Sequence, residues 1–533
     1  MTVHRYGSAE WSFVSAKTYA DPFHDVKLTM HVACPDGNSV SVPGFWAGEN
    51  VWKVRFSSPL TGEFTYVTES SEPSLSRQSG SFTVTPYEGS NPLYLHGPVC
   101  RKGDDLHLSH DDGTPFFWLG DTWWMGFTTR LSFPEEFAEL TADRVKKGFN
   151  VVQLVAGLYP DMEPFDPRGA NEAGFPWTED FSSVCPAYFD AAEKRIFHLI
   201  ENGISPFLVG SWGFFMKFVG MKVLKEHWQY MIARWASCPV IWCVAGEANM
   251  TFYDDDSLSM EEHLKQSRKN WNEMTSFIRE SDPFHRLVTI HPTVIGHEQI
   301  EDETLLDADL LQTGHSGVTS LVPTLKWVKE TVDRKKHPVI NDECCYEGNC
   351  GTSYCDIQRY VYLSNIFLGS AGFTYGANGL WQVNGVTVPY GASPHGASWG
   401  DTSWKDAAAL PGSGQIGMCK TWLEQYPWHR MERHPEWVEN PNNAETLDGN
   451  FCIGIPGEVR LFFVPLYGGS FWGSIRIYGL EQDVSYEALR FDPLTGTETL
   501  LGDVTPDEQG AWQFPRVPMF HDWIMAIRRK SAL

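Results

Sequence analysis

The stretch "PVIWCVAGE", residues 239–247, is an apolar run that ends on a carboxylate, Glu247. A run this short and apolar is typical of a strand buried on both faces, as in a parallel sheet covered by helices. It lies between two amphipathic stretches, residues 221–238 and 261–281, whose apolar spacing predicts helices. The stretch therefore predicts one strand–helix unit, with Glu247 at the carboxyl end of the strand.

Apolar runs of the same kind recur on both sides of it, most of them followed by an amphipathic stretch. The eight runs begin at residues 115, 149, 205, 239, 285, 308, 337 and 370. Eight such units in one continuous stretch predict a protein of the α/β class with a (β/α)₈ (TIM) barrel over residues 91–425. A doubly wound open sheet is the alternative, but no strand is followed by the GxGxxG sequence of dinucleotide-binding sheets.

Two regions without this rhythm flank the predicted barrel. Residues 1–90 alternate apolar and polar positions and carry the turn sequences "PDGN", "AGEN" and "PLTGE", which predicts an immunoglobulin-like β-sandwich. Residues 426–533 return to short strands and turns, which predicts a second, smaller β-sandwich. The chain is therefore expected to have three domains.

Composition excludes several classes of partner. The formal net charge of −26 over 533 residues argues against binding to nucleic acid or to an anionic membrane surface, and is compatible with a neutral substrate. No apolar run reaches the roughly 18 residues that span a bilayer. The opening "MTVHRYGSAEWSF" lacks the apolar core of a signal peptide. The 11 cysteines are scattered without a CxxC pair, so we expect a cytoplasmic protein without a disulfide framework or a zinc site.

Functional groups of such barrels lie at the carboxyl ends of the strands. The 22 tryptophans favour a carbohydrate site, since sugar C–H faces stack on flat rings, although a large aromatic core explains the same count. The histidines at strand ends can contact sugar hydroxyls or be satisfied core residues, and their spacing fits no metal motif, so we expect neither metal nor cofactor. The residues expected to bind substrate are Asp121, Trp123, Trp124, Gln153, Trp212, Asn249, His291, Gln312, His315, Tyr375 and Trp381.

Two carboxylates on different strands stand out from this set. Glu247 follows the fourth strand and Glu343 follows the seventh, and these strands face each other across the barrel mouth. Glycoside hydrolysis needs such a pair, one acid to protonate the leaving oxygen and one carboxylate to attack the anomeric carbon or activate water. Burial and mutual repulsion would keep one of them protonated near neutral pH. Asp342 competes with Glu343, because alternation turns neighbours to opposite faces; we prefer Glu343 for its longer reach.

Several of these segments resemble one family. "PFFWLGDTWW", "FNVVQLVAG", "LQTGHS", "PVINDE" and "SAGFTYGANGLW" are similar to the apiosidase-like glycoside hydrolases, a group of retaining (β/α)₈ enzymes. The first 90 residues resemble the immunoglobulin-like domain often fused in front of that barrel, and "FDPLTGTET" (491–499) resembles the small β-sandwich that often follows it. The resemblance implies an acid/base after strand four and a nucleophile after strand seven, which fall on Glu247 and Glu343.

The chain departs from that pattern at one place. Apiosidase-like barrels often carry Asp at the strand-four position, and the wider retaining clan usually has Asn directly before the acid/base Glu; here the pair is Gly246-Glu247. The longer acid and the missing side chain at residue 246 leave the identity of the sugar open.

The sequence thus predicts a retaining exo-glycosidase of small glycosides or oligosaccharides, with pentosides or furanosides favoured. Exo action follows from the expected cytoplasmic location and from the long loop at residues 157–185, which could wall off a pocket. The alternatives are an inactive barrel that binds carbohydrate without cleaving it, and a metal-dependent lyase or isomerase. The two β domains offer surfaces through which copies of the chain could form a homo-oligomer.

Overall fold

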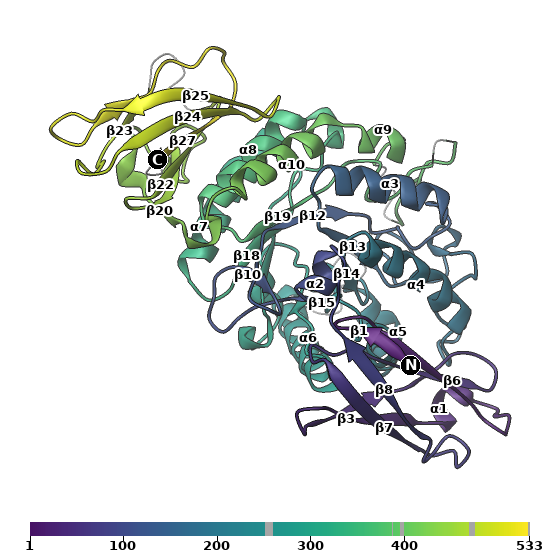
Figure 1. The fold of residues 1–533 in the computed structure, drawn as a ribbon. Coiled ribbons are helices and arrows are strands. Elements are labelled where there is room, and N and C mark those ends of the chain that lie inside the picture. Colours follow the sequence, from purple (N-terminus) through teal and green to yellow (C-terminus); the bar gives the residue numbers. More distant parts are fainter. Residues whose placement is uncertain (251–258, 386, 395–398, 468–474, 531–533) are drawn as a thin grey trace.

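A computed structural model describes residues 1–250, 259–385, 387–394, 399–467 and 475–530 (Figure 1). Its centre is a parallel eight-stranded sheet in the order β16-β15-β14-β13-β12-β19-β18-β17. The strands are β12 (Trp118–Thr122), β13 (Val151–Val155), β14 (Ser205–Val209), β15 (Ile241–Cys243), β16 (Val288–Thr289), β17 (Asp309–Gln312), β18 (Val339–Glu343) and β19 (Gly372–Tyr375).

The sheet curls into a nearly closed barrel. The two edge strands of the sheet are β16 and β17. They are joined just before β17, where the Asp307 N–H donates to the Val288 carbonyl at 2.9 Å. The Val288 N–H in turn donates to the Asp307 carboxylate at 2.8 Å. The predicted (β/α)₈ barrel is confirmed.

Helices cover the outside of the barrel, as Figure 1 shows. The long helices between and after the strands are α3 (Glu135–Lys146), α4 (Pro186–Glu201), α5 (Phe215–Trp235), α6 (Met260–Ser281), α7 (Val318–Asp333), α8 (Cys355–Phe367) and α10 (Pro411–Leu423). Short helices are α1 (Pro22–Asp25), α2 (Pro92–Leu95) and α9 (Trp404–Ala408). None of the helices in the described ranges is long and apolar enough to cross a membrane.

One predicted strand is divided in the structure. The apolar run that begins at residue 115 was expected to form a single barrel strand. Instead Pro115–Phe116 (β11) pairs with Leu108–His110 (β10), which also pairs with Val99–Cys100 (β9) in a small antiparallel sheet. Only Trp118–Thr122 enters the barrel. Continuous apolarity therefore ran across the boundary between two sheets.

The N-terminal region forms two sheets whose strands pair antiparallel, except for the parallel pair of β1 and β8. One sheet has the order β1-β8-β7-β3-β4 and the other β2-β6-β5. Side chains from both sheets share one core, with Phe64 stacked on Phe82 at 5.1 Å and Trp52 fully enclosed. The immunoglobulin-like topology expected for this region stays a prediction. The strands are β1 (Thr2–His4), β2 (Ala9–Val14), β3 (Leu28–Ala33), β4 (Ser39–Pro43), β5 (Phe45–Trp46), β6 (Val51–Phe56), β7 (Gly62–Ser70) and β8 (Ser79–Thr85).

The C-terminal region, yellow in Figure 1, is a six-stranded sheet with a separate pair of strands. It is attached to the barrel through Arg359 of α8, whose guanidinium donates to Asp522 at 3.0 Å. The sheet order is β20 (Glu432–Arg433), β21 (Phe451–Ile455), β22 (Val459–Val464), β27 (Trp523–Arg529), β24 (Tyr486–Asp492) and β25 (Thr497–Val504), and the pair is β23 (Arg476–Ile477) with β26 (Trp512–Gln513).

Candidate active site

Glu247 and Glu343 meet at the carboxyl ends of the barrel strands. Glu343 is the last residue of β18, and Glu247 lies four residues beyond β15. Gln312, at the end of β17, lies between them: its side-chain N–H₂ donates to Glu247 Oε1 at 3.1 Å and to Glu343 Oε1 at 3.0 Å. The two carboxylate oxygens are therefore no more than about 6 Å apart, the span of two such hydrogen bonds.

The backbone at Glu247 is held in an uncommon conformation. Its φ of 43° lies in the left-handed region that non-glycine residues rarely adopt. The Trp212 indole N–H donates to Glu247 Oε2 at 3.0 Å. A Cβ at Gly246 would lie 2.3 Å from the Trp212 ring, and one at Gly213 would lie 2.5 Å from the Glu247 carbonyl oxygen. Gly246 is therefore glycine because the Trp212 indole lies where a side chain would be.

The surroundings of Glu247 favour its protonated form. Burial raises its pKa most, and the negative charge of Glu343 raises it further. The positive field of His291 and the hydrogen bonds from Gln312 and Trp212 offset only part of this, so the pKa lies at about 7. This carboxyl group can hold a proton near neutral pH.

The surroundings of Glu343 have the opposite effect. Burial alone would raise its pKa, but the ring of His315, 2.7 Å from Oε1, and that of His291, 3.5 Å from Oε2, outweigh burial. The Tyr346 hydroxyl donates to Oε2 at 2.5 Å. The pKa of Glu343 therefore lies below its ordinary value. The pKa values of these two neighbouring carboxyl groups are thus shifted in opposite directions, so that one group is protonated while the other is ionised.

A bulge between β17 and β18 turns two consecutive acids toward the barrel interior. Leu311 pairs with Asn341 and Gln312 pairs with Glu343, which leaves Asp342 without a partner in the ladder. Strict alternation would have turned one acid out of the barrel, and that expectation is wrong here. Glu343 lies toward the mouth, while Asp342 lies deeper.

Side chains from across the barrel surround Asp342. Its Oδ1 accepts hydrogen bonds from Gln153 and from Thr374, the latter at 3.0 Å. Its Oδ2 lies 2.8 Å from His291 Nδ1. Gln153 therefore supports the carboxylate cluster from below; the expectation that it contacts substrate is corrected, because its side chain is fully buried and bonded within the barrel.

Other predicted residues join the site around the two glutamates. The Trp124 ring lies 5.4 Å from Trp212 and 5.2 Å from His291, centroid to centroid. Gln312 Oε1, His315 Nδ1 and Asn249 Oδ1 are buried polar atoms without a hydrogen-bond partner among the described residues. Such orphaned atoms are uncommon in protein interiors and can be completed by a polar ligand.

Three predicted residues lie away from this cluster. Asp121 accepts from the Arg144 guanidinium at 2.6 Å and from the Trp123 indole at 2.7 Å. The Tyr375 hydroxyl donates to Glu347 at 2.6 Å. Asp121, Trp123 and Tyr375 are each 0% exposed. They hold the barrel to its outer helices instead of facing substrate, which corrects the expectation for all three.

Two further residues lie in segments that follow barrel strands. Trp381, in the segment after β19, packs against the rings of Tyr390 and Trp399 at 5.8 and 6.0 Å and is 6% exposed. Tyr346 was missed, although it bonds Glu343 directly. It lies in a loop three residues past the strand, where no periodicity indicates direction; its closeness to Glu343 in "ECCYE" was the only signal.

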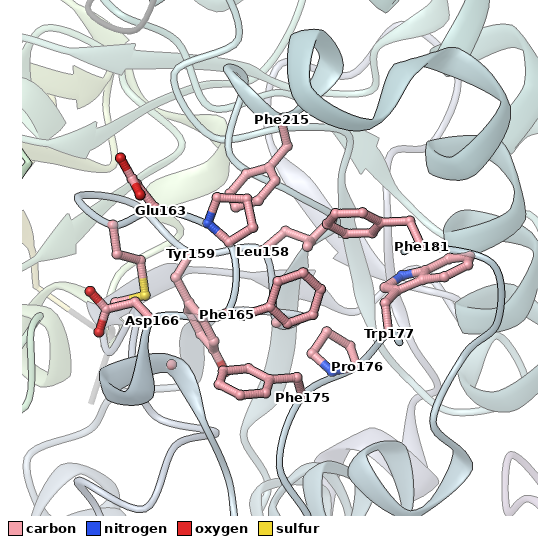
Figure 2. Close-up of a pocket in the computed structure, with 14 residues that line it drawn as sticks. Leu158, Tyr159, Glu163, Phe165, Asp166, Phe175, Pro176, Trp177, Phe181 and Phe215 are labelled. Atoms are coloured by element: carbon pink, nitrogen blue, oxygen red, sulfur yellow. The ribbon is translucent and has the colours of Figure 1, made fainter. Parts of the chain in front are cut away.

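The long loop after β13 has a small core of its own, shown in Figure 2. The rings of Phe165, Phe175, Trp177 and Phe181 gather there beside Phe215 of α5. The gap between them is about 20 Å³, room for about one water molecule, so it is not a sugar pocket.

Hydrogen bonds fasten this loop to its neighbours. The Leu158 carbonyl accepts from the Trp212 N–H at 2.9 Å. The Tyr390 hydroxyl donates to the Pro160 carbonyl and the Trp399 indole donates to Asp161, both at 3.2 Å. The loop therefore forms a braced wall between Trp212 and the segment after β19.

Solved structures with this fold include glycoside hydrolases. A candidate glycoside hydrolase from Bacteroides vulgatus ATCC 8482 superposes with a TM-score of 0.71 at 21% identity, covering 99% of this chain and 100% of that one. A glycoside hydrolase family 5 protein of the same organism gives 0.66 at 21%, covering 83% and 95%. A third structure, a glycoside hydrolase, gives 0.67 at 18%, covering 83% and 98%. These similarities show the shared fold.

Sequence families agree with the fold. No curated protein sequence matches the chain significantly. Residues 2–71 match a domain of unknown function, DUF5060. Residues 103–430, more than half of the chain and including both glutamates, match the apiosidase-like catalytic domain. The chain therefore belongs to the apiosidase-like family, and it has the barrel fold of the glycoside hydrolases.

Proposed function

We propose that this protein is a retaining glycosidase, with Glu343 as nucleophile and Glu247 as acid/base. The observation that carries the proposal is the Gln312 bridge, which limits the two carboxylate oxygens to about 6 Å. Retaining pairs lie roughly 5–5.5 Å apart, whereas inverting pairs lie roughly 6.5–9.5 Å apart to admit a water molecule. The bridge thus favours direct attack by a carboxylate.

The reaction proceeds in two displacements. A Glu343 carboxylate oxygen bonds to the anomeric carbon as the bond to the leaving oxygen breaks, and Glu247 gives that oxygen its proton. Glu247, now ionised, then removes a proton from water, whose oxygen attacks the anomeric carbon and releases Glu343. The sugar leaves with its original anomeric configuration.

The opposite pKa shifts support this division of roles. The pKa of Glu247, raised to about 7 by burial and by Glu343, keeps a proton available for the leaving group. The pKa of Glu343, for which the two histidines outweigh the effect of burial, lies low enough for a carboxylate nucleophile.

The surroundings support a neutral sugar as substrate. The rings of Trp124 and Trp212 suit stacking. The side-chain atoms of Gln312, His315 and Asn249 that find no partner within the described part of the chain suit hydroxyl groups. We further propose exo action on small pentosides or furanosides in the cytoplasm. The braced loop after β13 supports exo action, since a wall on one side of the mouth suits the end of a glycan better than its middle.

Hydrolysis of aryl pentosides and hexosides by the wild-type chain tests the proposal. Glu247→Ala should lose activity, and azide should partly restore it on substrates with an activated leaving group, giving a glycosyl azide of retained configuration. Glu347→Gln is the matched control, because Glu347 is a buried glutamate near Glu343 that bonds Tyr375 and the Gly412 N–H instead of the site. Unchanged turnover in Glu247→Ala or Glu343→Ala would exclude the assignment.

Two further measurements separate the other two functions. A barrel that only binds carbohydrate would give calorimetric binding of sugars with no cleavage of any of them. A metal-dependent lyase or isomerase would lose its activity on treatment with a chelator, whereas the two-carboxylate mechanism should be unaffected.

A further inference from the structure

We propose that Asp342 is a positioning residue that acts through His291 to keep the Glu343 nucleophile ionised and oriented. The inference rests on the proposed retaining mechanism and assigns a role to a third carboxylate. Asp342 does not touch the substrate in this arrangement; its effect reaches the anomeric carbon only through the imidazole and the nucleophile.

The three side chains form a line from the barrel interior to the mouth. Asp342 Oδ2 lies 2.8 Å from His291 Nδ1, and His291 Nε2 lies 3.5 Å from Glu343 Oε2. The first distance is a hydrogen bond and the second an ion-pair contact. Asp342 and His291 are both 0% exposed, and Glu343 is 6% exposed. Water therefore does not screen this line of charges.

The chemistry of the three groups fixes the charge on the middle one. Both ring nitrogens of His291 face carboxylates, and an ionised carboxylate only accepts hydrogen bonds. A neutral imidazole would aim one lone pair at a carboxylate oxygen. The doubly protonated ring instead donates to Asp342 through Nδ1 and places its positive charge 3.5 Å from Glu343, where Nε2 makes an ion-pair contact without a hydrogen bond to the described residues. Burial lowers the pKa of His291, but the hydrogen bond with Asp342 and the charges of Glu343 and Glu247 outweigh it, and the pKa is raised.

Other groups face the nucleophile, and they divide between its two oxygens. Glu343 Oε1 is contacted by His315 and Gln312. Oε2 is contacted by the Tyr346 hydroxyl and by His291. Tyr346 is neutral when it donates, so His291 supplies the positive charge at Oε2, while His315 supplies it at Oε1. Each oxygen thus has its own imidazole. Within the described ranges, Asp342 bonds the ring of His291, whereas Nδ1 of His315 has no hydrogen-bond partner.

The β17–β18 bulge makes this line possible. Without the register shift between Leu311 and Gln312, Asp342 and Glu343 would point to opposite faces of β18. Gln153 and Thr374, from β13 and β19, fix the other oxygen of Asp342. The orientation of Asp342 is therefore set by three strands independently of His291.

Proton and nitrogen NMR of ¹⁵N-histidine-labelled protein tests the charge state without any substrate. Comparison with His291→Gln assigns the His291 signals. We expect His291 in the wild-type chain to carry protons on both nitrogens at pH 7 and to titrate above the ordinary range of a histidine. In Asp342→Asn its titration should move to lower pH. A wild-type His291 that is neutral at pH 7 would overturn the inference, whether or not Asp342→Asn folds.

Kinetics then tests the effect on the nucleophile. In Asp342→Asn, the less charged His291 should let the pKa of Glu343 rise, so the acidic limb of kcat/KM should move upward by about one pH unit. Such a shift is roughly a tenfold loss of kcat/KM below the limb. The loss should fall on kcat rather than KM. The double variant Asp342→Asn/His291→Gln should lose little more than His291→Gln alone, since both act along one line.

Asp121→Asn is the matched control, because Asp121 is an equally buried barrel aspartate bonded to Arg144. It should leave the acidic limb in place. A limb unmoved in Asp342→Asn, or moved equally in Asp121→Asn, would contradict the positioning role. If no glycoside is hydrolysed by the wild-type chain, the proposed function fails, while the NMR titration still decides the charge of His291.

Discussion

The barrel has two sides whose strand ends carry similar residues in opposite states. On the β12–β19 side, Asp121 and Tyr375 are bonded to Arg144 and Glu347 and are closed to solvent. On the β15–β18 side, Glu247 and Glu343 lie beside polar atoms that have no hydrogen-bond partner among the described residues. A carboxylate at a strand end is therefore not sufficient evidence for a site. On the β12–β19 side the polar groups form hydrogen bonds within the protein, whereas on the β15–β18 side polar atoms remain available to a ligand.

The largest expected difference between the two sides is in catalysis. Glu343→Gln on the β15–β18 side should lower kcat by on the order of 10⁴-fold or more, because the nucleophile is lost. Glu347→Gln on the β12–β19 side should leave kcat of the folded protein close to wild type. Steady-state kinetics on an aryl glycoside measures both, and a comparable loss of kcat in the two variants would remove the distinction.

Stability should show the reverse order. Asp121→Asn removes one partner of a buried ion pair and leaves the Arg144 guanidinium with Asp143 as its remaining counter-charge, which costs up to about 3–5 kcal/mol of unfolding free energy. Urea unfolding followed by tryptophan fluorescence measures the change. A loss below about 1 kcal/mol would mean that the β12–β19 side is not held by this pair.

Glu247 in the site should lower the stability of the folded protein as pH rises. The pKa of Glu247 is raised to about 7 in the folded state, so the folded state binds this proton more tightly than the unfolded chain does. Stability is therefore lost as pH rises from the unfolded pKa, near 4.5, through 7. Glu247→Gln should be more stable than wild type by up to about 3 kcal/mol at pH 8 and equal to it at pH 4. Thermal unfolding at the two pH values checks this, and a gain of the same size at pH 4 would contradict the linkage.

The smallest effect concerns two glycines. Gly246→Ala places a Cβ 2.3 Å from the Trp212 ring. It should lower the free energy of unfolding by about 1–3 kcal/mol and also reduce activity. Gly414→Ala in α10, where a Cβ meets nothing within 4 Å, should instead stabilise the chain by about 0.5–1 kcal/mol. Chemical denaturation of the pair measures both signs. Equal changes in unfolding free energy would show that the Trp212 ring can move aside at little cost.

The barrel was predictable because buried parallel strands are continuous apolar runs, and eight of them can be counted without knowing any contact. The two glutamates were found because each lies at the carboxyl end of such a strand. Asp121 and Tyr375 were misassigned because strand position does not tell whether a neighbouring element supplies a partner. Here Arg144 of α3 pairs with Asp121, and Glu347 of the loop after β18 accepts from Tyr375. The inward turn of Asp342 needed the bulge, and a one-residue slip between strands leaves no mark in composition or periodicity.

The contact between Gly246 and Trp212 also bears on how this site can change by mutation. A side chain at residue 246 and an indole at residue 212 compete for one volume, so neither substitution can be judged alone. A route to a larger residue 246 must first pass through a smaller residue 212, and that step removes the N–H that holds Glu247. The intermediate sequence would be less fit than either end, so the glycine and the tryptophan should be inherited together or replaced together.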